Sequence, residues 1–167
     1  MPDRPHDDNG YVLVRFAAVA LTALLLGGCG AFTAPAQPTA GDLTDIVAAL
    51  VLRHMTITDQ VAGDPGCGSQ ISALHSNAVR YDVRPAGDSN SYPVYVFSWK
   101  SQATFDADKV AFDSCVGAEE QSSIGPVDIV EYLPWRAFGP GWPTGLRDAV
   151  DAALKGASGI PAPQEPE

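Results

Sequence analysis

Apolar side chains recur at helical spacing in three segments of the chain, which we expect to fold as amphipathic helices. The first begins at Asp42 and the second at Ser101, residue types that cap the free N–H groups at a helix start. The third begins at Pro143, because the fixed backbone of proline suits the first helical position. The apolar positions are Leu43, Ile46, Val47, Leu50 and Val51 in the first segment, Phe105, Phe112, Cys115 and Val116 in the second, and Leu146, Ala149, Val150, Ala153 and Leu154 in the third.

Three further segments have the apolar pattern of strands. Residues 77–84 alternate between apolar and polar, whereas 92–99 are apolar on both faces and predict a central strand. The polar loop between them indicates an antiparallel hairpin. Residues 127–133 predict a third strand, and a short fourth strand would lie at 56–58. This order of elements predicts an α+β fold: a small, mainly antiparallel sheet of three or four strands with helices packed on one face.

The stretch before the last helix, WRAFGPGWP, is unusually rich in aromatic residues. Glycine and proline at 139–141 extend a strand poorly, so we expect a loop here. Aromatic and arginine side chains anchor many interfaces, and aromatic rings also stack on sugars. Trp135, Arg136, Phe138 and Trp142 are therefore candidate binding residues for an envelope protein or a glycan. The alternative is that the rings cover the sheet edge and that Trp142 packs at the start of the last helix.

The N-terminal part of the chain has the pattern of an export signal. The uncharged, almost wholly apolar run 16–26 follows Arg15 and is shorter than the about 20 residues that a membrane-spanning helix needs. It ends in Leu26, Gly27, Gly28 and Cys29. This combination resembles the lipobox of bacterial lipoprotein precursors. The resemblance implies cleavage before Cys29 and attachment of a lipid to its thiol, so that the membrane is a partner through this residue.

Composition along the chain divides it into four parts. Residues 1–28 are the expected signal peptide, which is removed. Residues 29–41 form the lipidated N-terminus and a flexible tether, since the segment is uncharged and rich in Ala, Pro, Gly and Thr. Residues 42–157 form a single globular α+β domain, and 158–167 are a Pro-rich tail that we expect to be disordered.

Cys67 and Cys115 are the two cysteines that remain once Cys29 carries lipid. An even pair in an exported chain predicts a disulfide, which would pin the turn at 63–70 to the second helix. A redox-active pair would more typically be a CxxC motif, which is absent, and a zinc site lacks enough ligands. We therefore expect one structural disulfide and neither a metal nor a cofactor.

The charge balance narrows the classes of partner. The chain has 20 acidic and 10 basic side chains, a formal net charge of −10 at pH 7. Nucleic-acid binding needs a basic patch to neutralise phosphates, so we expect no nucleic-acid partner. The same balance disfavours electrostatic docking onto anionic lipid. Asp106, Asp108 and Asp113 lack the glycine and final glutamate of a calcium loop and are expected on a solvated helix face.

Motifs for catalysis are scarce. His54 and His75 are the histidines of the expected mature domain, and the sequence has neither a GxSxG elbow, nor an HExxH motif, nor a glycine-rich phosphate loop. The sequence therefore favours a lipid-anchored extracytoplasmic protein with a non-catalytic binding or accessory role at the cell envelope. The alternative is a small envelope hydrolase that uses His54 or His75.

Overall fold

A computed structural model describes residues 41–67 and 71–159 of the chain. These residues belong to the second of two compact units, Pro38–Glu167. The expected signal peptide, the lipidation residue Cys29 and nearly all of the expected tether and tail lie outside the described residues. No helix of the described part is long and apolar enough to cross a membrane.

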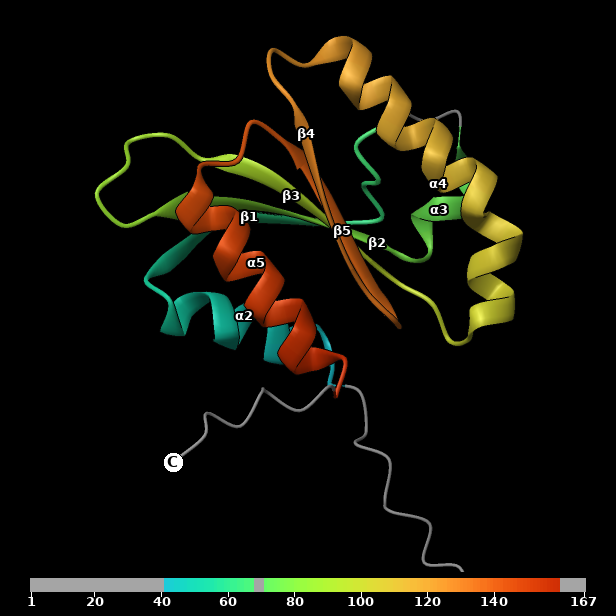
Figure 1. The fold of residues 1–167 in the computed structure, drawn as a ribbon, viewed down its shortest axis with the longest axis horizontal. Helices are drawn as coiled ribbons and strands as arrows, with labels where there is room; N and C mark the ends of the chain where they lie inside the picture. Colours follow the sequence, from blue (N-terminus) through green and yellow to red (C-terminus); the bar gives the residue numbers. More distant parts are fainter. Residues whose placement is uncertain (1–40, 68–70, 160–167) are drawn as a thin grey trace, which may run out of the picture. The chain divides into compact units, whose positions relative to one another are not determined.

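The described residues form one α+β body with a five-stranded antiparallel sheet, in the strand order β1-β2-β3-β5-β4 (Figure 1). The α+β class and the antiparallel sheet agree with the sequence prediction. The elements are α2 (Leu43–Leu52), β1 (Met55–Ala62), α3 (Ser72–His75), β2 (Ala78–Pro85), β3 (Tyr92–Ser98), α4 (Gln102–Ser122), β4 (Val127–Tyr132), β5 (Trp135–Pro140) and α5 (Thr144–Ala157).

The helix starts follow the capping signals in the sequence. Asp42 accepts hydrogen bonds from the backbone N–H groups of Thr44 and Asp45 at the start of α2. Ser101 accepts one from the N–H of Thr104 at the start of α4. Pro143 is the cap residue of α5 and not its first helical residue. These side chains and the proline place the helix boundaries locally, before any tertiary contact is considered.

The sheet has five strands and not the three or four that the sequence predicts. The additional strand is β5, which lies between β3 and β4 in the sheet. Its residues belong to the aromatic stretch before the last helix, where we expected a loop. Its glycine and proline lie at its end, where Gly139 pairs with Asp128 and Pro140 with Val127. A strand-breaking composition is tolerated there because pairing with β4 and the burial of Gly139 outweigh the weak intrinsic preference of these residues for a strand.

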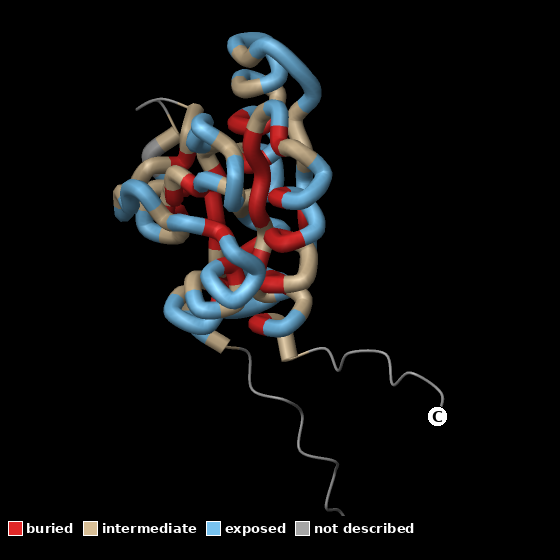
Figure 2. Tube along the Cα trace, turned by 90° about the vertical axis from the view of Figure 1, so that its left-hand side faces the viewer, coloured by how far each residue is buried: buried red, intermediate tan, exposed pale blue. Residues whose placement is uncertain are grey.

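Helices cover both faces of the sheet, so the predicted one-sided packing is wrong (Figure 1). Along β3, Val94 and Val96 join the apolar cluster under α2 and α5, whereas Tyr95 and Phe97 join a second cluster under α3 and α4. Successive residues of a strand point to opposite faces, so a strand without polar positions needs a cover on each. In Figure 2 the buried segments run through the middle of the body, between exposed outer segments.

The second cluster is built around aromatic rings. Phe97 stacks on Trp99 and on Phe138, with ring centroids 5.7 Å apart in both pairs. Phe112 from α4 meets Phe97 edge-on at 5.2 Å. Stacked and edge-on rings contribute more than their buried area alone, so this cluster fixes α4 on the sheet.

Gly139 of β5 is required by close packing. A Cβ at this position would lie against the backbone oxygen of Pro93 and the indole of Trp142, well inside the 3.0 Å that real Cβ atoms keep. Trp142 in turn donates from its indole N–H to the Pro93 oxygen at 2.9 Å. The glycine therefore lets the chain after β5 fold back onto β3.

We predict that Gly139→Ala lowers the free energy of unfolding by about 1–3 kcal/mol, the usual cost of forcing extra atoms into a packed site. The matched control is Gly117→Ala in α4, where a Cβ meets nothing within 4 Å. That change should raise stability by about 0.5–1 kcal/mol, because alanine favours a helix over glycine. Urea unfolding of both variants measures the contrast, and equal stability of Gly139→Ala and wild type would contradict the packing argument.

Candidate functional site

Cys67 and Cys115 form a disulfide, as the sequence predicts, with their Cα atoms 4.9 Å apart. The bond joins the segment after β1 to α4 across 48 residues of sequence. Cys115 is fully buried in the aromatic cluster under α4. The pair therefore acts as a structural staple between the sheet and its second helical layer.

The aromatic residues proposed for binding belong to the core. Trp135, Phe138 and Trp142 are only 5%, 0% and 7% exposed. The Trp135 indole donates to the backbone oxygen of Ala157 at 3.3 Å, which ties β5 to the end of α5. With the rings buried and the expected loop folded as a strand, the alternative interpretation applies: these rings stabilise the fold and do not present an aromatic docking surface.

Arg136, the fourth candidate binding residue, is also largely covered. The side chain is 11% exposed, and its guanidinium carbon lies 3.5 Å from the ring centroid of Phe105. Burial lowers the pKa of Arg136, while its ion pair with Glu131 opposes that shift. Stacking on Phe105 and pairing with Glu131 occupy the group that a ligand would need.

The two histidines lie in unrelated settings. His54 is exposed in the turn between α2 and β1, where its backbone has a φ of 61°. His75 ends α3, and its Nε2 atom is enclosed without a hydrogen-bond partner. Neither side chain forms a hydrogen bond or ion pair with an acidic residue in the described part of the chain, and no group of metal-ligating side chains is found there. The described residues therefore offer no catalytic pairing for either histidine.

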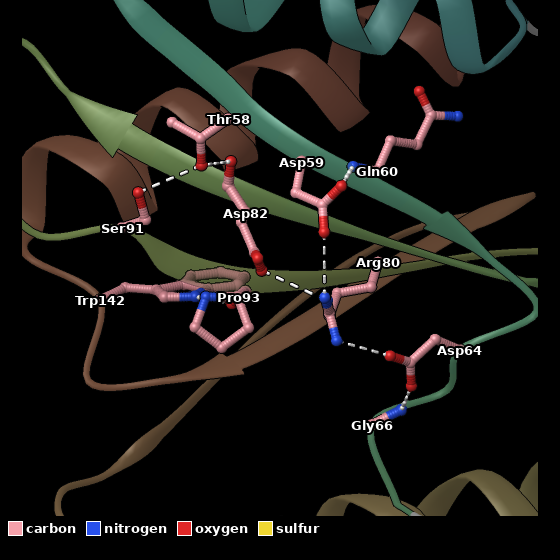
Figure 3. Close-up of polar contacts among 10 residues, drawn as sticks. All are labelled: Thr58, Asp59, Gln60, Asp64, Gly66, Arg80, Asp82, Ser91, Pro93 and Trp142. Carbon is pink, nitrogen blue, oxygen red and sulfur yellow. Dashed lines mark hydrogen bonds and ion pairs between the residues drawn. The ribbon is translucent and has the colours of Figure 1, made fainter.

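The polar cluster that sequence analysis missed is centred on Arg80 (Figure 3). Its guanidinium forms ion pairs with Asp64 at 2.8 Å, Asp82 at 3.2 Å and Asp59 at 3.4 Å. Burial disfavours the charge on Arg80, but the three carboxylates and Tyr95 raise its pKa above the ordinary value. We refer to these four charged residues as the Arg80 network.

The Arg80 network fixes the segment that leads to the disulfide. Asp64 pairs with Arg80 and also accepts the backbone N–H of Gly66 at 2.9 Å. Gly66 has a φ of +80° and lies so close to the Tyr95 ring that a Cβ could not fit. Residues 63–66, GDPG, therefore do more than turn the chain. They also bring it into contact with the Tyr95 ring immediately before Cys67. The alternation of charges along β2 was the only sequence signal for this cluster.

A hollow of about 230 Å³ lies between α2 and the sheet. Its lining comes from α2, β1 and β2, on the face of the sheet opposite Arg80. Apolar side chains and uncharged polar side chains both contribute, and the lining contains no charged residue. The lining residues are Leu43, Thr44, Val47, Gln60 and Tyr81.

Comparison with protein-family models, with curated proteins and with solved structures finds no match to this chain. The interpretation of its surface therefore depends on the chemistry of its own residues.

We predict that replacing both Cys67 and Cys115 with Ser lowers the free energy of unfolding by about 2–5 kcal/mol, the range for native disulfides in small exported domains. Denaturant unfolding of the two proteins without reductant measures the difference. Wild type treated with reductant is the control and should approach the variant. Peptide mapping that finds both thiols free in exported wild-type protein would contradict the disulfide.

The pKa of Tyr95 leads to a test by pH. Burial, helped by the charges of Glu119 and Asp64, raises the pKa of Tyr95 from 10.0 to about 12. The unfolded chain therefore loses the phenol proton first, so the stability that Tyr95 contributes is present below pH 10 and is lost as pH rises towards 12. We expect Tyr95→Phe to flatten the loss of stability over this interval. Thermal unfolding of wild type and Tyr95→Phe at a series of pH values measures it, and an unchanged slope in Tyr95→Phe would refute the assignment.

Proposed function

We propose that this chain is a lipid-anchored protein of the bacterial cell envelope whose body has a non-catalytic binding or accessory role outside the cytoplasm. The observation that carries the proposal is the apolar run 16–26, whose last residue Leu26 is followed directly by Gly27, Gly28 and Cys29. Acyl chains on Cys29 contribute about 0.8 kcal/mol for each buried CH₂ group, and two or more chains make attachment stable.

The disulfide supports export. Disulfides persist in oxidising compartments and are rare in the cytosol, where thiols are kept reduced. The bond between Cys67 and Cys115 holds a buried part of α4, so a reducing environment would remove a substantial contribution to stability.

The point where the tether meets the body also fits anchorage. The backbone N–H of Gly41 donates to the oxygen of Ala157 at 2.6 Å, so the body begins beside the end of α5. In Figure 1 this is the end of the body formed by α2 and α5. The expected tether would therefore join the body at the start of α2.

A non-catalytic role fits the polar chemistry of the body. The carboxylates of the Arg80 network are paired with a guanidinium, and the aromatic and arginine residues of β5 are buried. A hydrolase would need a histidine beside a nucleophile and oriented by an acid. No contact of His54 or His75 within the described residues favours that alternative.

We predict that mass spectrometry of the membrane fraction finds a mature chain that starts at Cys29 and is heavier by its acyl groups. Cys29→Ala should lose that mass and its partition into membranes, because no thiol remains for the lipid. The control variant carries Ser at Cys67 and Cys115, which removes the disulfide and keeps Cys29, so it should stay with membranes. A Cys29→Ala chain that still partitions wholly with membranes would exclude lipid anchoring.

A further inference from the structure

The hollow under α2 lies at the outer edge of the sheet. Helix α5 packs on β4 and β5, whereas α2 packs on β1, which is the last strand in the order. The buried residues of α2, Ile46 and Leu50, point into the core. Leu43 and Val47 lie on the flank next to Gln60 of β1 and line the hollow. This position keeps the hollow open to molecules from solution.

Tyr81 supplies a free hydrogen-bond donor to this hollow. The residue is 1% exposed and lines the hollow, and its phenol forms no hydrogen bond with any described residue. Burial raises the pKa of Tyr81, so the phenol keeps its proton at neutral pH. The phenol oxygen is not one of the enclosed polar atoms without a partner, so water can reach it at the hollow. A ligand with an acceptor atom would take the place of that water and keep the hydrogen bond.

The rest of the lining defines the charge of a suitable ligand. Gln60 brings an amide and Thr44 a hydroxyl, and neither side chain has a hydrogen-bond partner among the described residues. Figure 3 shows the Gln60 side chain directed away from the Arg80 network. Asp42 caps α2 and Asp45 lies in its first turn, next in sequence to the lining residues Leu43 and Thr44. A hollow without cations and next to carboxylates disfavours anions. Both carboxylates accept backbone N–H groups at the helix start, which takes up their charge and disfavours a cation as well, so an uncharged ligand fits best.

The volume sets the size of the ligand. About 230 Å³ exceeds the about 150 Å³ of an engineered apolar cavity that holds benzene and is smaller than the about 300–1,000 Å³ of pockets for drug-sized molecules. Leu43 and Val47 supply an apolar wall for the body of the ligand. The space therefore suits a single ring or a compact branched aliphatic group that carries one acceptor.

A peptide strand added to the edge of β1 is disfavoured by the geometry of that edge. The pairing of β1 with β2 shifts register between Ile57 and Asp59, immediately before Gln60. Such bulges interrupt the regular row of backbone groups that a new strand would need, and they protect sheet edges from pairing. The side-chain hollow, and not the strand edge, is therefore the feature suited to binding.

We propose that the hollow between α2 and β1 binds an uncharged single-ring or compact aliphatic molecule whose carbonyl or hydroxyl oxygen accepts a hydrogen bond from the Tyr81 phenol. This inference gives a ligand class to the binding role proposed above and rests on that role for its biological meaning. The two proposals fail separately, because lipid attachment is read from Cys29 and ligand binding from the hollow.

Methyl NMR on the full chain in lipid nanodiscs tests the proposal, since Leu43, Thr44 and Val47 all carry methyl groups and no detergent competes for the hollow. Cyclohexanone is the probe with an acceptor, methylenecyclohexane its isostere without one, and cyclohexanecarboxylate its charged analogue. We expect saturable shifts of these methyl signals with millimolar cyclohexanone and weaker binding of the other two probes.

Variants distinguish the contribution of the Tyr81 hydrogen bond from that of the volume of the hollow. Tyr81→Phe should weaken cyclohexanone binding about 2- to 12-fold, the effect of losing one hydrogen bond. It should leave the affinity for methylenecyclohexane unchanged. Val47→Phe should fill the hollow and abolish binding of both. The matched control is Tyr132→Phe, because its phenol donates to Asp151 near the opposite edge of the sheet.

Three results would overturn the proposal. The first is the absence of saturable shifts at the hollow in a wild-type protein with well-dispersed core methyl signals. The second is equal binding of cyclohexanone and methylenecyclohexane, or equal cyclohexanone affinity of wild type and Tyr81→Phe. The third is tighter binding of cyclohexanecarboxylate than of cyclohexanone, which would contradict the neutral ligand class.

Discussion

Strand β3 has to bury apolar side chains on both of its faces, and the rest of the structure depends on this requirement. Val94 and Val96 face the layer of α2 and α5, while Tyr95 and Phe97 face the layer of α3 and α4. A sheet covered on one side would leave one of these rows in water, at a cost that grows with the exposed apolar area. The second helical layer is therefore as necessary as the first, and β5 completes the surface on which both layers rest.

The layer that contains α4 is held by three kinds of interaction in addition to apolar packing. The disulfide ties α4 to the segment after β1, the Arg80 network fixes the turn before Cys67, and Gly66 allows that turn to approach the Tyr95 ring. The four charged residues of the Arg80 network and the turn before Cys67 therefore stabilise the fold. This explains why a cluster of carboxylates on the surface need not be a catalytic or metal site, since all three carboxylates share ion pairs with the Arg80 guanidinium.

The candidate functions arise from different levels of structure. The proposed anchor is a local motif of four residues, so sequence alone indicates it. The hollow exists only where α2 crosses β1 and β2, and its five lining residues come from three separate elements. Trp135, Phe138 and Trp142 show the converse, because a composition typical of interfaces is also typical of a buried strand whose neighbours supply the partner surfaces. Composition identifies such residues, whereas only their burial distinguishes between the two uses.

Local physical chemistry in the sequence determined the helices with capping residues at Asp42 and Ser101, the hairpin of β2 and β3, and the pairing of Cys67 with Cys115, since each depends on neighbouring residues or on an even count. Tertiary structure decided the rest. Gly139 and Pro140 disfavour a strand on their own, yet both pair with β4, and the residues before them, Trp135–Phe138, pair with β3 and β4 on both sides. Likewise, nothing near Arg136 in sequence indicates the Phe105 ring that covers it, because that contact exists only after α4 has packed on the sheet.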